Sequence, residues 1–210
     1  MKDPFERPWH GIGTGGTLAL DFANTLDWRL RKRPIELLKG YADLLRFARS
    51  AGVLSPAEAR ELRRWAEAHP VPAGRALAEA ARVREAIGAV LQAIVDGRKP
   101  ALAPLAQIEA ACRVAADARS LRITDAMAAW TWRERTPEAD RPAWAAALDA
   151  ARILTTVEWD RVRQCGDAEC GWFFLDTSRN GSRRWCSMKV CGNRNKARRF
   201  YRRSVKTKPK

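Results

Sequence analysis

The sequence has very little histidine and shows no catalytic arrangement. Its 210 residues include only two histidines, His10 and His69, which are far apart in the chain and lie in no motif. No nucleophile beside a general base presents itself either. We therefore expect a protein that is not an enzyme.

Long apolar runs are also missing. No stretch approaches the roughly 18 residues of a membrane span, and residues 1–10 mix charges with prolines, unlike a secretory signal. With 46% hydrophobic and 30% charged residues, the composition is typical of a soluble globular protein. We expect a cytoplasmic protein without a membrane partner, in a reducing compartment where clustered cysteines favour metal over disulfides.

Acidic residues are absent after Asp176. Residues 161–210 contain 15 Lys and Arg against three acids, whereas residues 1–160 contain 24 against 21, within a net charge of +15. Such asymmetry indicates a polyanionic partner. Nucleic acid, foremost duplex DNA, is the leading candidate. An anionic membrane surface is second, because it requires a broad apolar helix face that the last segment lacks.

Four of the five cysteines form two C-x4-C pairs separated by 15 residues: Cys165, Cys170, Cys186 and Cys191. This spacing favours one tetrahedral structural zinc over four buried thiols or two disulfides. Four thiolates leave the metal no open position, which disfavours hydrolytic catalysis there. Cys112 lies in an alanine-rich run and is expected to be a small buried hydrophobe.

The spacing of apolar residues in 1–160 predicts a mainly α domain with one small β-hairpin, an α+β arrangement overall. Ser55-Pro56-Ala57-Glu58 has the signature of a capping box. The expected helices cover residues 18–28, 37–51, 55–68, 75–95, 102–118 and 142–163, and the expected hairpin covers 121–126 and 128–133.

Residues 161–203 predict a treble-clef-like zinc finger. It comprises a knuckle at 165–170, a strand at 172–175, a type I′ turn at Asn180-Gly181, a return strand at 183–185 and a helix from Met188 to about Arg203. Residues 204–210 are expected to be a disordered basic tail. Trp172, Phe173 and Phe174 could stack on bases, but a small core around the zinc is the favoured interpretation.

The basic residues of the finger are the candidates for nucleic-acid contact, since arginine can pair with guanine or phosphate. Asn193 could read a base edge or cap the local backbone. The candidate set is Arg179, Arg183, Arg184, Asn193, Arg194, Lys196, Arg198, Arg199, Arg202 and Arg203.

Two N-terminal patterns leave alternatives open. Gly11-x-Gly13-x-x-Gly16 matches a dinucleotide fingerprint, but no strand precedes it and no βαβ unit follows. The polar set Asp21, Asn24, Asp27 and Trp28 lies in an apolar segment. These residues either bind a small molecule or hold the segment in place by hydrogen bonds, and we favour the second.

Two stretches of sequence carry a family resemblance. Residues 191–194 read CGNR, and residues 175–187 read LDTSRNGSRRWCS. Together they closely resemble the CGNR zinc-finger family of bacterial proteins. Residues 18–25 (LALDFANT), followed by Asp27-Trp28-Arg29, are similar to the opening of the ABATE domain, which pairs with that finger. The resemblance covers essentially the whole chain and implies a stress-linked transcription regulator with a DNA-binding finger and an N-terminal sensor.

Three functions therefore compete. The first is sequence-specific DNA binding biased by a small-molecule or protein effector, with a homodimer expected because one finger has a small footprint. The second is association with RNA or the ribosome, with the aromatic strand stacking on unpaired bases. The third is a small-molecule-binding or enzymatic N-terminal domain that the finger merely delivers.

Overall fold

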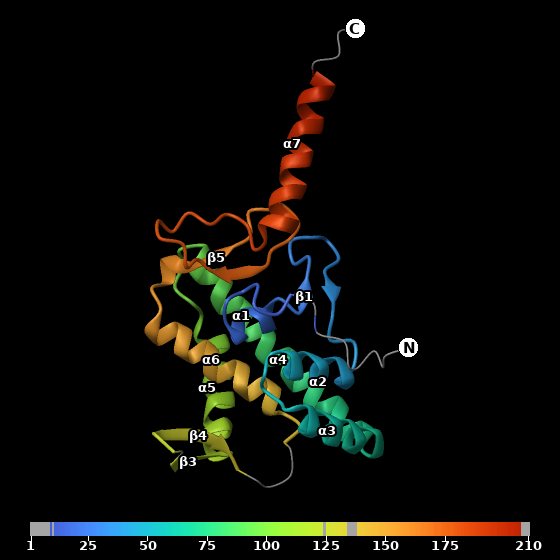
Figure 1. Cartoon of the computed structure of the whole chain (residues 1–210), viewed down its shortest axis with the longest axis vertical. Coiled ribbons are helices and arrows are strands. Elements are labelled where there is room, and N and C mark those ends of the chain that lie inside the picture. The colour runs from blue at the N-terminus through green and yellow to red at the C-terminus, as the bar shows by residue number, and fades with distance from the viewer. Residues whose placement is uncertain (1–8, 10, 124, 134–137, 207–210) are drawn as a thin grey trace.

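The protein is mainly α-helical, and its described residues include three small antiparallel β-hairpins (Figure 1). The computed structural model describes residues 9, 11–123, 125–133 and 138–206, and the side chains up to Arg202. The helices are α1 (Leu18–Ala23), α2 (Tyr41–Ser50), α3 (Pro56–Ala68), α4 (Pro70–Val95), α5 (Leu102–Asp117), α6 (Arg141–Thr156) and α7 (Asn193–Lys206). None of the described helices has the length and apolar character that a membrane crossing requires.

Each hairpin pairs two neighbouring strands. β1 (Leu26–Asp27) pairs with β2 (Ile35–Glu36), β3 (Arg119–Ile123) with β4 (Ala128–Trp132), and β5 (Val162–Gln164) with β6 (Phe173–Leu175). The β3–β4 hairpin confirms the expected one, and the indole of its Trp132 stacks on Trp144 of α6 at 6.4 Å between ring centroids.

Helix α4 is the centre of the helical body. It contacts α1, α2, α3, α5 and α6, and also β5 of the finger. Its apolar side chains recur at helical spacing and are buried: Ala80, Val83, Ile87, Val90, Leu91 and Ile94. The short helix α1 is buried between α4, α6 and β6, so it joins the helical body to the finger.

Helix starts follow the local capping chemistry. The capping box at α3 is confirmed: the Ser55 hydroxyl accepts from the Glu58 N–H at 3.2 Å, and the Glu58 carboxylate accepts from the Ser55 N–H at 2.7 Å. Helix α2 begins at Tyr41 rather than Leu37. The N–H of Leu37 instead donates to the Thr25 carbonyl, and that of Leu38 to the Glu36 carboxylate. Helix α4 begins at Pro70, five residues earlier than expected.

Two predicted helices are too long. The one expected over 18–28 ends at Ala23, because β1 follows it and Trp28 has the left-handed φ of 53°. The one expected over 142–163 ends at Thr156. Val157 is extended, with φ −109° and ψ 138°, and the chain continues through a 3-10 turn into β5. Apolar spacing alone did not reveal that β1 pairs with β2 and that β5 pairs with β6.

The finger has a different hairpin from the one predicted. Strand β6 pairs with β5, which precedes the first cysteine, and not with residues 183–185. Asn180 lacks the positive φ that a type I′ turn requires. The loop is instead held by the Asp176 carboxylate, which accepts from the N–H groups of Ser178 and Arg183 at 2.9 Å each. The order β5, knuckle, β6 and helix keeps the arrangement treble-clef-like.

Helix α7 extends away from the rest of the molecule at the end opposite to the β3–β4 hairpin (Figure 1). It continues to Lys206, three residues into the range that we expected to be disordered, and residues 207–210 lie outside the described part. A π-helical turn, Met188–Gly192, leads into it.

Asn24 joins the finger to the helical body. Its side chain is 3% exposed. The Asn24 amide N–H donates to the Phe173 carbonyl at 2.9 Å, and the amide oxygen accepts from the Phe173 N–H at 2.8 Å. The Phe173 ring packs in the main core with α1. The finger therefore shares its core with the helical body.

Replacing Asn24 tests this junction. Asn24→Ala leaves a buried N–H and a buried C=O of Phe173 without partners, and each such group costs about 1–3 kcal/mol. We expect the free energy of unfolding, measured with urea, to fall by about 2–6 kcal/mol. Asn180→Ala, at an exposed loop position, is the control and should change it by less than about 0.5 kcal/mol. Equal effects of the two variants would contradict the assigned role.

Candidate metal centre

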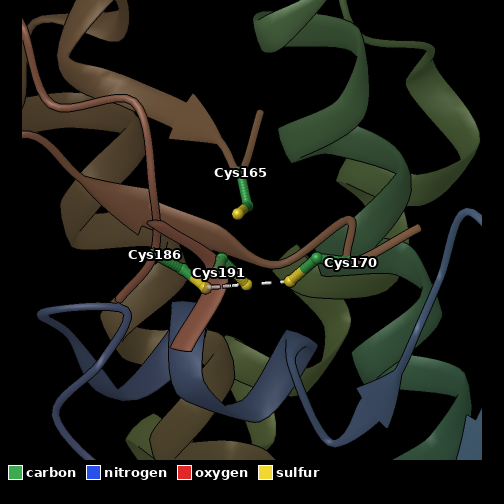
Figure 2. Close-up of side chains that lie close together, drawn as sticks. All are labelled: Cys165, Cys170, Cys186 and Cys191. Atoms are coloured by element: carbon green, nitrogen blue, oxygen red, sulfur yellow. Dashed lines mark hydrogen bonds between the residues drawn. The ribbon is translucent and has the colours of Figure 1, made fainter. Parts of the chain in front are cut away.

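Two segments of the finger supply the four cysteines. Cys165 follows β5 and Cys170 precedes β6, so both lie in the knuckle between the strands. Cys186 lies in the loop before the π-helical turn, and Cys191 lies within that turn. All four side chains are buried and their sulfurs converge (Figure 2).

The sulfur positions fit a tetrahedral zinc. All four Sγ atoms lie within 4.8 Å of one another. Cys170 Sγ is 3.7 Å from Cys186 Sγ, which is 3.6 Å from Cys191 Sγ. A tetrahedron with Zn–S bonds of about 2.3 Å has edges of about 3.8 Å. The cysteines are those of one structural zinc site, and four thiolate ligands leave that ion no vacant position for a substrate.

The thiols affect one another's protonation. Hydrogen bonds from Cys170 and Cys186 lower the pKa of the Cys165 thiol to about 2, and backbone N–H groups of Cys186 and Asp167 add to this. The hydrogen bond with Cys165 raises the pKa of Cys170 and of Cys186. Burial, followed by the charge of Cys165, raises the pKa of Cys191. Zinc therefore has to displace protons from the thiols whose pKa is raised.

The knuckle is fitted closely to the segment after β1. Gly171 has a φ of 71°, and a Cβ there would lie 2.8 Å from the Cβ of Arg29, so only glycine is accommodated. The N–H of Arg29 donates to the Cys170 carbonyl at 3.1 Å. The Arg29 guanidinium donates to the Ala23 carbonyl at 2.8 Å. The metal-binding turn thus contacts the helical body directly.

A buried carboxylate fixes the direction of α7. Asp167, in the knuckle, has a fully buried side chain. It accepts a hydrogen bond from the Asn195 amide at 2.7 Å, and it forms ion pairs with Arg194 at 3.2 Å and Arg198 at 3.6 Å. Arg198 also pairs with Glu169 at 2.9 Å. The first two turns of α7 are thereby attached to the knuckle.

The predicted nucleic-acid contacts separate into two groups. Arg183 donates to the backbone carbonyls of Thr14, Leu175, Trp185 and Cys186. Arg194 donates to Cys191 Sγ at 3.0 Å. Together with Arg198, these residues are engaged within the protein. The side chain of Arg203 lies outside the described part, and the exposed members are Arg179, Arg184, Asn193, Lys196, Arg199 and Arg202.

The aromatic strand contributes to the core, which is the interpretation that the sequence favoured over base stacking. Phe174 is buried among the cysteines, and Phe173 is buried in the main core. Trp172 is half-buried, and its indole N–H donates to the Asp27 carboxylate at 2.8 Å. Asn193 donates through its side chain to the Lys189 carbonyl at 3.2 Å, which is the backbone-capping alternative for this residue.

The polar side chains of the N-terminal segment form hydrogen bonds with backbone groups. The Asp21 carboxylate accepts from the N–H groups of Gly13 and Gly15 at 2.6 and 2.7 Å. Burial raises the pKa of Asp21, although both hydrogen bonds act to lower it. The glycine-rich loop that matched a dinucleotide fingerprint thus wraps around this carboxylate. Asn24 and Asp27 contact the finger, and the Trp28 ring lies under the guanidinium groups of Arg31 and Arg194.

Sequence reasoning missed the acidic partners of the finger. Asp167 and Glu169 were counted only as charges, although both lie inside the knuckle and face arginines of α7. The signal was present: two acids between paired cysteines, and arginines at positions 194 and 198, one helical turn apart on the following helix. His69 Nδ1–H donates to the Trp65 carbonyl at 2.9 Å, and His69 has no metal ligand nearby among the described residues. His10 lies outside that part of the chain.

Zinc binding should release protons. Because the pKa values of Cys170, Cys186 and Cys191 are raised, zinc titrated into metal-free protein in weak buffer near pH 7 should release protons. Zinc affinity should accordingly rise with pH, as measured by competition with a chromophoric chelator. Cys112→Ser should leave one zinc per chain, whereas Cys186→Ser should abolish it. A zinc affinity that does not change with pH, or one zinc still bound to Cys186→Ser, would contradict the assignment.

Comparisons with known proteins agree with the two parts of the chain. Residues 161–204 match the family zf-CGNR, described as "CGNR zinc finger". Residues 16–157 match the family ABATE, described as "Putative stress-induced transcription regulator". No curated protein matches the chain. The ABATE match covers well over half of the 210 residues and the cysteine tetrad lies within the second match, so the chain belongs to the ABATE family and ends in a CGNR zinc finger.

Proposed function

We propose that this protein is a cytoplasmic, DNA-binding transcription regulator that presents helix α7 to duplex DNA, while its helical part senses an effector. The proposal is supported most by the character of α7, which contains no acidic residue and extends away from the body (Figure 1). The family description, which concerns transcription regulation, agrees with it.

The cations of α7 fall into two groups, one paired with acids and one unpaired. Arg194 and Arg198 are bound to the knuckle carboxylates. Lys196, Arg199 and Arg202 follow one another at three-residue intervals and are exposed, and within the described residues no acid pairs with them. The first group fixes the helix, and the second is available for phosphate oxygens, each contact releasing condensed counterions from DNA.

The contrast with the RNA alternative rests on the aromatic strand. Base stacking there requires exposed rings, yet Phe173 and Phe174 are buried and the Trp172 indole is bound to Asp27. We therefore favour duplex DNA. A catalytic role is not part of the proposal, because the four-thiolate site leaves its zinc no open position.

A second copy of the chain belongs to the proposal. Helix α7 has 14 residues, and a helix of this length covers one half-site at most. The affinity typical of sequence-specific DNA binding requires a larger protein–DNA interface than one zinc finger supplies. A homodimer binding two half-sites meets this requirement, and sedimentation in the presence of DNA measures the stoichiometry.

The exposed face of α7 gives a quantitative prediction. We expect the triple variant Lys196→Ala, Arg199→Ala and Arg202→Ala to weaken duplex binding at about 100 mM salt by at least tenfold. Its log Kobs against log [salt] slope should become shallower by about 2.7 per chain, since each lost phosphate contact removes about 0.9. Fluorescence anisotropy of labelled DNA across a salt series measures both quantities.

A matched control separates local contact from net charge. The variant Arg60→Ala, Arg64→Ala and Arg75→Ala removes the same charge from exposed positions of α3 and α4, and it should leave the slope within about 0.5 of the parent value. If both triple variants lower the slope equally, α7 is not the DNA-binding element. Tighter binding of single-stranded RNA than of duplex DNA would favour the RNA alternative.

A further inference from the structure

A half-enclosed cavity of about 350 Å³ lies beside the zinc centre, at the junction of the helical body and the finger. We call it the junction cavity. One wall comes from the N-terminal loop and the end of β1, and the other comes from the knuckle, the π-helical turn and α7. Its volume falls within the range of about 300–1,000 Å³ that small-molecule sites occupy.

The junction cavity is lined mainly by apolar and aromatic side chains, including Ile12, Trp28, Trp172 and Val190. The Trp172 ring is held in place from two sides. Its N–H donates to Asp27, and a Cβ at Gly11, which has a φ of 91°, would lie only 2.5 Å from the ring atom Cη2. The N-terminal loop thus closes tightly on a fixed aromatic wall.

Asp27 gives the junction cavity an uncompensated negative charge. Its Oδ1 accepts from the Trp172 indole and from the Trp28 N–H at 2.8 and 2.7 Å. Within the described part of the chain, its Oδ2 has no hydrogen-bond donor and the carboxylate has no ion-pair partner. The cation in the wall, Arg194, is already paired with Asp167 and with the Cys191 sulfur. A half-buried carboxylate without a paired cation favours a ligand of opposite sign.

The aromatic wall also attracts positive charge. Two guanidinium groups lie over the Trp28 ring, that of Arg31 at 3.4 Å and that of Arg194 at 4.4 Å from the centroid. Such contacts reflect the negative potential of an indole face. Three of the cysteine ligands line the same space, and four thiolates around one Zn²⁺ carry a formal charge of about −2. An amine or ammonium group complements these features, whereas the Arg194 guanidinium, the cation in the wall, is already held by Asp167 and the Cys191 sulfur.

We propose that the junction cavity binds a small organic cation, an amine or ammonium compound with a compact apolar body. Its charge lies at the Asp27 carboxylate and its body lies against the indole of Trp172. This proposal names the chemical class of the effector in the proposed function. It rests on that function only for the effect that the bound cation would have on DNA binding. A bound cation lies between the N-terminal segment and the π-helical turn that leads into α7, so its affinity depends on how that helix is held.

The test compares three probes of similar shape against the zinc-loaded full chain by isothermal titration calorimetry. They are phenethylamine, which is cationic, 3-phenylpropan-1-ol, which is neutral, and 3-phenylpropanoate, which is anionic. We expect phenethylamine to bind at least tenfold more tightly than 3-phenylpropanoate, with the alcohol between them. Equal affinities, or no binding of the amine up to its solubility limit, would overturn the proposal.

Two variants locate the binding. Asp27→Asn keeps an acceptor for the Trp172 and Trp28 N–H groups but removes the charge, and it should erase the preference for the amine. Val190→Arg places a cation at the exposed rim, where Val190 is 53% exposed. It should lower the affinity for the amine at least fivefold. Asp117→Asn, at an exposed position at the end of α5, is the matched control and should leave all three affinities unchanged.

Circular dichroism and zinc content establish that each variant is folded. An undiminished preference for the amine in both Asp27→Asn and Val190→Arg would assign the binding to another site and refute the proposal. The titration contains no DNA, so its outcome stands apart from that of the salt series on α7.

Discussion

The pairing of the Asn24 side chain with the backbone of Phe173 is the contact on which the rest of this structure depends. An asparagine amide presents an N–H donor and a C=O acceptor side by side, so Asn24 pairs with the N–H and C=O of Phe173 as a residue of a neighbouring strand would. Helix α1 ends at Ala23, immediately before Asn24, and the Arg29 N–H contacts the knuckle at the Cys170 carbonyl. The finger is thereby built onto the helical body, in contrast to a module joined by a flexible linker.

This attachment determines what the cations of the finger can do. A short metal-bound segment has little core of its own, so the direction of its helix has to be fixed by other contacts. Asp167 and Glu169 perform this task by binding Arg194 and Arg198. Arg183 gives all its described hydrogen bonds to carbonyl groups. The arginines that look most like a DNA-binding motif are thus largely structural, and the exposed side of α7 remains for a polyanion.

The sequence predicted some elements reliably because their causes are local. The capping box at Ser55, the cysteine spacing and the alternating Trp130 and Trp132 each depend on neighbours within a few residues. The errors arose where a distant partner decides. Residues 24–28 have helical spacing but pair with β2 and β6. Asn180-Gly181 has the composition of a tight turn, but the loop takes another conformation because the Asp176 carboxylate binds the N–H groups of Ser178 and Arg183. The junction cavity could not be predicted, because its two walls are separated by more than 130 residues.

The central claim, that finger and helical body unfold as one unit, can be tested by heating the zinc-loaded protein in the presence of a chromophoric zinc indicator. Zinc release is followed by absorbance and helix loss by circular dichroism at 222 nm in the same sample. If Phe173 and Asn24 join the two parts into one core, the two transitions coincide. Complete zinc release while the helical signal remains native would show that the finger is a separate unit and would contradict this account.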